Sequence, residues 1–182
     1  PYIGSRPHYH FRFTKRNIIV LLAVIFLAAL AGCGVTYFTS KNFYGKVNAD
    51  NTELFVINTE NCPSTIEDKY YLPCLPDGYE VSGTPFYEWI SYENPVTEQT
   101  LTFCQFAKVS FDSTHYDTEN QKFQGINING HSGLCLDYSS QGYNYAGIVW
   151  DNGDYIFELF GEYSKNELCD LAKTAKVIEN NK

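Results

Sequence analysis

The stretch A-G-I-V-W-D-N-G-D-Y-I-F-E-L-F-G, residues 146–161, decides the fold because it has the pattern of two strands joined by a tight turn. Apolar residues alternate on both sides of Asn152-Gly153. Asn-Gly between alternating runs is a strong hairpin signal, since both central residues of a type I′ turn need a positive φ. We therefore expect antiparallel strands at Tyr143–Trp150 and Tyr155–Gly161.

The same period of two recurs upstream of this hairpin. It predicts five more strands: Tyr79–Gly83, Phe86–Tyr92, Thr100–Phe111, Phe123–Asn129 and Gly133–Tyr138. Pro76-Asp77-Gly78 predicts a turn before the first of them, because proline fixes φ and glycine accepts a positive φ. Asn129-Gly130 is a second, weaker hairpin signal.

The end of the chain changes to a helical pattern. Ser164 and Glu167 have the spacing of a capping box. Apolar residues then recur at helical spacing through Leu168, Leu171, Ala172, Ala175 and Ile178. The fold class predicted is α+β: an N-terminal transmembrane helix, then an antiparallel sheet of six or seven strands with one C-terminal helix packed on it.

An uncharged apolar run of 21 residues, Ile18–Phe38, precedes the domain. About 20 such residues are needed to cross ~30 Å of hydrocarbon. Arg12, Lys15 and Arg16 lie just before the run, so the positive-inside rule places residues 1–16 in the cytoplasm and the C-terminal part outside the cell.

The run also supports a lipoprotein interpretation. Leu30-Ala31-Gly32-Cys33 has the small-residue pattern of a lipoprotein cleavage site, with Cys33 as the lipidated residue. We favour a retained helix, because apolarity continues through Tyr37 and Phe38, which suit the aromatic belt of a membrane span. Both alternatives anchor the domain to the outer face of the cell membrane.

Four segments follow from these patterns. Residues 1–16 form a basic cytoplasmic stub, expected to belong to a longer chain because the sequence contains no methionine. Residues 17–38 are the transmembrane helix or lipoprotein signal. Residues 39–69 form a juxtamembrane segment with a short helix and one strand, and residues 70–182 form the extracytoplasmic α+β domain.

Charge argues against nucleic acid as a partner. Residues 1–17 contain four basic residues and no acid, whereas the remainder contains nine lysines, no arginine and all 21 acidic residues, a net charge of −12. Phosphate contacts need clustered lysine and arginine. The membrane is the one partner that the sequence indicates.

No catalytic, cofactor-binding or metal-binding residue is assigned from the sequence. His8 and His10 precede the apolar run, and His115 and His131 lack neighbouring ligands at the spacing of a zinc site. Gly130-His131-Ser132-Gly133 resembles a nucleophile elbow, but Leu134 stands where that motif requires glycine.

Acidic and aromatic residues are expected in ordinary structural positions. Asp151 and Asp154 beside the Asn-Gly turn, and the pair Glu158 and Glu162, are expected to be solvated. Aromatic strand residues, Trp89 and Trp150 among them, are expected in the core or in cross-strand pairs.

Five cysteines lie in the proposed external domain, where disulfides can persist: 62, 74, 104, 135 and 169. Cys62 and Cys74 enclose a short loop and are one predicted pair. Cys104 and Cys135 are a second, on the condition that their strands are neighbours, because a bridge needs Cα atoms within ~7 Å. We expect Cys169 to be the free thiol.

Three segments resemble a known bacterial family, domain-of-unknown-function family 4367, over roughly residues 70–178. They are Y-L-P-C-L-P-D-G-Y-E (71–80), I-N-I-N-G (126–130) and G-I-V-W-D-N-G-D-Y-I-F-E-L-F-G-E-Y-S-K-N-E-L-C-D-L-A-K-T-A-K (147–176). The resemblance implies an extracytoplasmic sensory or regulatory module with a single membrane span, common in Firmicutes, and it transfers no catalytic residue.

We therefore expect a non-catalytic, membrane-anchored binding or sensory domain of the bacterial envelope. The alternative is a surface lipoprotein, anchored through Cys33, that acts as a solute-binding or transport accessory component.

Overall fold

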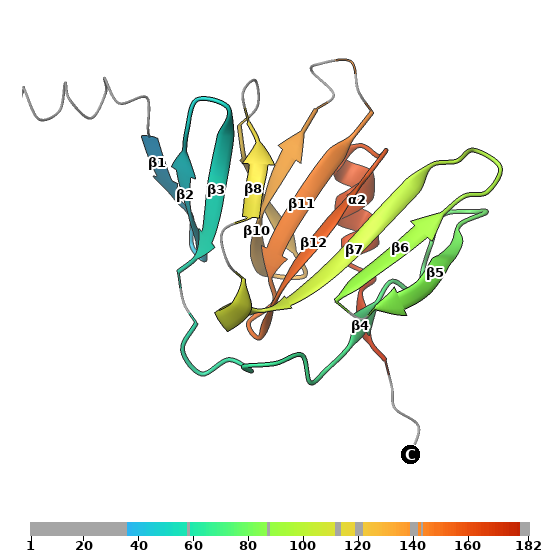
Figure 1. The fold of residues 1–182 in the computed structure, drawn as a ribbon, viewed down its shortest axis with the longest axis horizontal. Coiled ribbons are helices and arrows are strands. Elements are labelled where there is room, and N and C mark those ends of the chain that lie inside the picture. The colour runs from blue at the N-terminus through green and yellow to red at the C-terminus, as the bar shows by residue number, and fades with distance from the viewer. Residues whose placement is uncertain are drawn as a thin grey trace, which may run out of the picture. The chain divides into compact units, whose positions relative to one another are not determined.

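Seven strands form the main antiparallel sheet of the domain (Figure 1). They are β5 (Glu80–Phe86), β6 (Trp89–Glu93), β7 (Thr100–Ala107), β9 (Gln124–Ile128), β10 (His131–Asp137), β11 (Ala146–Asp151) and β12 (Tyr155–Gly161). Their order across the sheet is β5-β6-β7-β12-β11-β10-β9. All seven strands predicted from the sequence lie in this one sheet, which confirms the α+β class.

This computed structural model describes residues 36–57, 59–86, 88–111, 114–118, 122–138, 142 and 144–178. Of the predicted span at residues 17–38, only the last three residues are described. Cys33 also lies outside the described residues. Those three residues begin strand β1 (Thr36–Thr39), so the predicted helix does not extend to Phe38. Among the described residues, no helix has the length and apolarity needed to cross a membrane.

Helix α2 (Lys165–Ala172) covers one face of the main sheet, where it lies against β9, β10, β11 and β12 (Figure 1). The predicted capping box is confirmed: the Ser164 hydroxyl accepts from the Glu167 amide, and the Glu167 carboxylate accepts from the Ser164 amide at 2.9 Å. The prediction that the helix reaches Ile178 is wrong. The helix ends at Ala172, and the chain then forms β13 (Lys176–Val177), which pairs with β4 (Tyr70–Tyr71).

The core beneath α2 is built from aromatic rings of the central strands. Phe157 stacks on Phe103 and on Trp150, with ring centroids 5.6 Å and 5.2 Å apart. Leu168 of α2 is fully buried in the same cluster. The apolar stripe of the helix therefore covers the apolar face of the sheet, as its spacing predicted.

Buried polar side chains attach the segment before β5 to this core. The Gln105 carboxamide accepts from the Tyr70 amide at 3.0 Å and donates to the Asp68 carbonyl at 2.7 Å. The Tyr155 hydroxyl accepts from the amides of Glu67 and Asp68. Glu67 and Asp68 lie outside the strands, and these bonds satisfy their backbone groups, so the irregular segment before β4 has a defined position.

A second, four-stranded sheet covers part of the opposite face. It has the order β1-β2-β3-β8, with β2 at Phe43–Val47, β3 at Asn51–Val56 and β8 at Thr114–Asp117. Phe43 and Leu54 are fully buried against Val149 and Ile156 of the main sheet. The prediction of a short helix and one strand for residues 39–69 is wrong, because β2 and β3 form a hairpin whose alternating apolar residues pack on the main sheet.

The β11–β12 turn follows different chemistry from the one predicted, whereas Gly78 has the positive φ predicted for the Pro76-Asp77-Gly78 turn, at 82°. In the β11–β12 loop only Gly153 has a positive φ, at 109°. Asn152 instead accepts through its side chain from the amides of Asp154 and Tyr155, at 3.0 and 2.8 Å. The weaker signal is the true two-residue turn: Asn129 and Gly130 have φ values of 51° and 89°, as a type I′ turn requires.

A buried ion pair joins the 3-10 helix that follows β7 to Asp151, the last residue of β11. Lys108, in the 3-10 helix Lys108–Ser110, lies with its Nζ 2.8 Å from Asp151 Oδ1, and the two side chains are only 7% and 4% exposed. Asp151 also accepts from the Gly153 amide. The expectation that Asp151 is solvated is therefore wrong.

Removing one member of this pair should be strongly destabilising. We expect Lys108→Met to lower the free energy of unfolding by about 3–5 kcal/mol, because it leaves the Asp151 carboxylate buried without a counter-charge. The double variant Lys108→Met/Asp151→Asn should recover most of that loss. Urea unfolding monitored by fluorescence measures the free energy of unfolding of both variants. An equal decrease in the single and the double variant would contradict a buried ion pair between Lys108 and Asp151.

Candidate functional site

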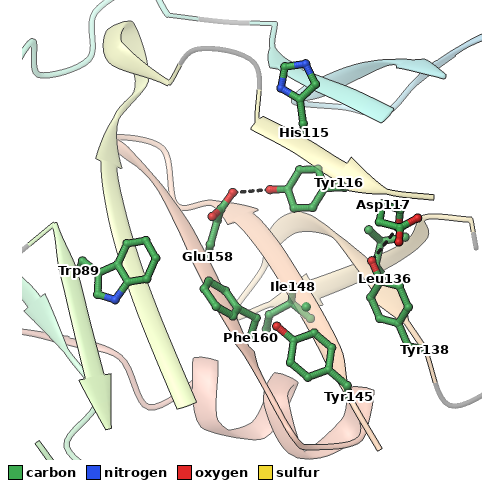
Figure 2. A pocket seen from close by; sticks show the side chains of 11 residues that line it. Trp89, His115, Tyr116, Asp117, Leu136, Tyr138, Tyr145, Ile148, Glu158 and Phe160 are labelled. Atoms are coloured by element: carbon green, nitrogen blue, oxygen red, sulfur yellow. Dashed lines mark hydrogen bonds between the residues drawn. The ribbon is translucent and has the colours of Figure 1, made fainter. Parts of the chain in front are cut away.

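A pocket of about 310 Å³ opens on the face of the main sheet that α2 does not cover (Figure 2). Strand β8 of the second sheet forms one wall, and β6, β10, β11 and β12 supply the others. The lining residues are Trp89, His115, Tyr116, Asp117, Leu136, Tyr138, Tyr145, Gly147, Ile148, Glu158 and Phe160. The pocket is thus bounded by both sheets of the domain.

Strand register explains why the sheet is hollowed at this point. Gly147 pairs with Leu136 on one side and with Phe160 on the other, so these three positions form one row across the sheet. Gly147 contributes no side chain to the row. A Cβ built there would meet only the Phe160 Cβ, at an ordinary contact distance of 3.6 Å, so the backbone does not require glycine. The missing side chain leaves the space between its neighbours open.

A buried carboxylate and a phenol meet in the pocket. Glu158 of β12 is only 8% exposed, and its carboxylate accepts a hydrogen bond from the Tyr116 hydroxyl of β8 (Figure 2). Burial raises the pKa of Glu158, and the bond from Tyr116 opposes that shift. Cys104 lies opposite Glu158 on β7, and burial, with a smaller effect of the Glu158 charge, raises the pKa of its thiol to about 12.

Aromatic rings form the remaining walls. Trp89 and Phe160 meet edge to face, with centroids 6.1 Å apart, and Trp89 remains 54% exposed. The rings of Tyr138 and Tyr145 lie 5.8 Å apart on another side, and the Tyr138 hydroxyl donates to the Asp117 carbonyl at 2.7 Å. Burial raises the pKa of both tyrosines, so both phenols are neutral at physiological pH. The pocket therefore combines aromatic surface with a small number of polar groups.

The acidic and aromatic residues noted in the sequence occupy three different places in the structure: the core, the surface and the pocket. Glu158 is buried, which corrects the expectation that it is solvated, whereas Glu162 and Asp154 are exposed. Trp150 belongs to the core as expected, but Trp89 lines the pocket.

Of the histidine and serine candidates within the described ranges, only His115 reaches the pocket. Its position on β8 places it among the lining residues. His131 and Ser132 begin β10 and do not line the pocket, and His8 and His10 lie outside the described residues. In the part of the chain that the structure describes, no group of three or more histidine, cysteine or acidic side chains is placed to hold a metal ion.

The two cysteines of the predicted second pair lie far apart. Strands β12 and β11 separate β7 from β10, and Cys104 faces the pocket side while Cys135 is fully buried in the core on the side of α2. The condition for a Cys104–Cys135 bridge is therefore not met. Cys62 and Cys74 are separate thiols in this structure, and the Cys62 thiol contacts the Thr59 carbonyl, so that pairing stays a prediction.

Sequence reasoning missed Glu158, Tyr116 and Gly147 as site residues. A signal for Glu158 exists: it is the single charged residue in Y-I-F-E-L-F-G, where its neighbours on the same face are Ile156 and Phe160. A charged residue between two large apolar ones on one strand face lies near either a buried partner or a cavity. No local signal marks Tyr116, because its strand pairs with β3, which lies far earlier in the chain.

Glu158 should make stability depend on pH. Its pKa in the folded protein lies above the reference value of 4.5, so its contribution to stability is complete below that value and is lost as pH rises through the folded pKa. The groups facing it are Tyr116 and Cys104. We expect Glu158→Gln to be at least as stable as the wild type at about pH 7 and to match it near pH 4.

Urea unfolding at the two pH values measures this difference. Glu162→Gln, the same change at an exposed carboxylate, is the control and should leave the pH dependence unaltered. A Glu158→Gln variant that keeps the wild-type pH dependence would show that another group is responsible.

Comparison with known proteins identifies a family. The family model described as "Domain of unknown function (DUF4367)" matches residues 69–174, which include all seven strands of the main sheet and α2. No curated protein and no solved structure matches the chain. The match spans more than half of the chain. It overlaps the sequence segments that resemble the same family. The chain belongs to the DUF4367 family.

Proposed function

We propose that this chain is a membrane-anchored, extracytoplasmic binding domain that acts in sensing or regulation in the bacterial envelope. The pocket between β8 and the main sheet is its binding site. The observation that carries the proposal is the pocket itself: a cavity of about 310 Å³ with aromatic walls and a buried carboxylate.

The size and lining of the pocket favour a small molecule. Ligand pockets occupy roughly 300–1,000 Å³, are mostly apolar and aromatic, and contain a few polar groups that orient the ligand. This pocket lies at the lower end of that range. Trp89, Tyr145 and Phe160 supply the apolar surface, and Glu158 and Tyr116 supply the polar groups.

The contacts of the polar groups favour binding over catalysis. Glu158 and Tyr116 are hydrogen-bonded to each other, which orients both without activating either as a nucleophile. Ser132 and His131, the residues considered for a hydrolase, do not line the pocket. The site is therefore proposed to recognise a ligand and to leave it unchanged.

The sequence supports the proposed location. The apolar run Ile18–Phe38 follows three basic residues, which favours a cytoplasmic N-terminus and an external domain. The anchor takes one of two forms, a retained helix or a lipid on Cys33, and both leave the pocket on the outside of the cell.

Protease treatment of intact cells should remove the domain while cytoplasmic markers survive. Cys33→Ala should leave the mass and the membrane association of the chain unchanged if the helix is retained. In a lipoprotein the same change would abolish lipid labelling and processing. Full protection of the domain in intact cells would contradict the external location.

Filling the pocket should abolish ligand binding without unfolding the protein. We expect Gly147→Val to fold with unchanged or slightly higher stability, by up to about 1 kcal/mol, because glycine inside a strand is unfavourable and space for the side chain is present. Its side chain would occupy the gap between Leu136 and Phe160. Ligand-observed NMR of the full chain against a library of small metabolites measures binding.

Gly125→Val is the matched control, because Gly125 is exposed on the edge strand β9 with no atom within 4 Å of the point where a Cβ would lie. Compounds that bind the wild type should bind Gly125→Val equally and should not bind Gly147→Val. Compounds that bind all three proteins with the same affinity would place binding elsewhere and overturn the pocket as the site.

A further inference from the structure

We propose that the pocket binds an organic cation, a small ammonium group attached to an apolar body, with Glu158 as its counter-ion. This inference rests on the proposed function and specifies the class of ligand. It follows from the charge, the walls and the position of the groups that line the pocket (Figure 2).

Glu158 carries a charge that no described neighbouring side chain balances. Ion pairs among the described residues join Lys46 to Glu53, Lys108 to Asp151 and Lys173 to Asp170, and Glu158 takes part in none of these. Glu158 is buried, and its carboxylate has a neutral phenol as its hydrogen-bond partner. A buried carboxylate is unfavourable unless a cation compensates it. An ammonium group entering the pocket would supply that charge.

The walls of the pocket are mainly aromatic and suit a cation. Aromatic rings attract cations through the negative potential of their faces, and tryptophan and tyrosine are the most effective. Trp89, Tyr138, Tyr145 and Phe160 surround the space next to Glu158. No lysine or arginine is among the described lining residues. An anionic ligand would meet the negative charge of Glu158, and a neutral one would leave that charge uncompensated.

The protonation of Glu158 should control the affinity of the pocket for a cation. Tyr116 of β8 and Cys104 of β7 are the titratable groups that face Glu158, while His115 and Asp117 of β8 also line the pocket. Burial raises the pKa of Glu158, so a cation that prefers the ionised form should bind more tightly as pH rises through that pKa. The pH dependence is measured in a His115→Gln variant, so that no imidazole lines the pocket.

Three probes of nearly the same shape test the ligand class: benzylamine, benzyl alcohol and benzoate. Calorimetric titration of the full chain at about pH 7.5 should show benzylamine binding at least ~10-fold more tightly than benzyl alcohol, with no binding of benzoate. Glu158→Gln should remove the preference for benzylamine. Glu162→Gln, the same change at an exposed acid, should retain it.

The outcomes separate this inference from the proposed function. Equal affinity for benzylamine and benzyl alcohol, or a preference for benzoate, would overturn the cation and leave the pocket as a binding site. A benzylamine preference that persists in Glu158→Gln would overturn Glu158 as the counter-ion.

A second measurement covers the case in which Glu158→Gln does not fold. Benzylamine affinity that does not rise between about pH 5 and about pH 8 in His115→Gln overturns the proposal, because Glu158 ionises as pH rises through its pKa. Absence of binding by all three probes also overturns it, while the metabolite screen with Gly147→Val tests the pocket separately.

Discussion

The alternation of side chains along β12 is the constraint on which both faces of the domain depend. Strand β12 lies at the centre of the main sheet, between β7 and β11. Tyr155, Phe157 and Leu159 point into the core beneath α2, while Ile156 and Glu158 point to the other layer. A register slip of one residue would exchange the two sets and bring a carboxylate into a cluster of aromatic rings. The core therefore fixes where the pocket chemistry can lie.

Specific contacts hold this register at both ends of β12. At its start, the Asn152 side chain accepts from two backbone amides and sets the length of the loop from β11. At its end, Gly161 lies so close to β7 that a Cβ would approach the Thr100 carbonyl oxygen to 2.7 Å. Glycine is needed there for close approach, in contrast to Gly147, whose surroundings would admit a side chain. The same residue type thus has a structural role at one position and leaves open space at the other.

Local pattern determined how much of this fold could be predicted. The strands of the main sheet and the cap at Ser164 were predicted correctly, because period-two alternation and capping chemistry act over a few residues. The second layer was not predicted. It depends on β8 pairing with β3, a contact between segments far apart in the chain with no signature in either segment alone. The position of Glu158 was misjudged for the same reason, since a polar residue at an alternating position is expected to be solvated until the covering layer is known.

The cysteines illustrate the limit of face assignment. A bridge between Cys104 and Cys135 needs neighbouring strands and side chains on the same face, and alternation within one strand does not relate its faces to those of another strand. The observed register pairs Cys104 with Glu158 on β12 and Cys135 with Ile148 on β11, and these partners lie on opposite faces of the sheet. Strand order and relative register are long-range properties, so a disulfide between strands cannot be deduced from spacing alone.

Two departures from a stable design converge on one place. Gly147, the second residue of β11, has neither a positive φ nor a close contact that requires glycine, and Glu158 places a carboxylate where an amide would make the same bond to Tyr116. A purely structural role explains neither, because valine and glutamine would serve the sheet better at these positions. Residues that lower stability without a structural need are expected to cluster at functional sites. Selection retains them there, although selection for stability alone would remove them. Gly147 provides the space and Glu158 provides the charge, and both line the pocket that we propose as the binding site.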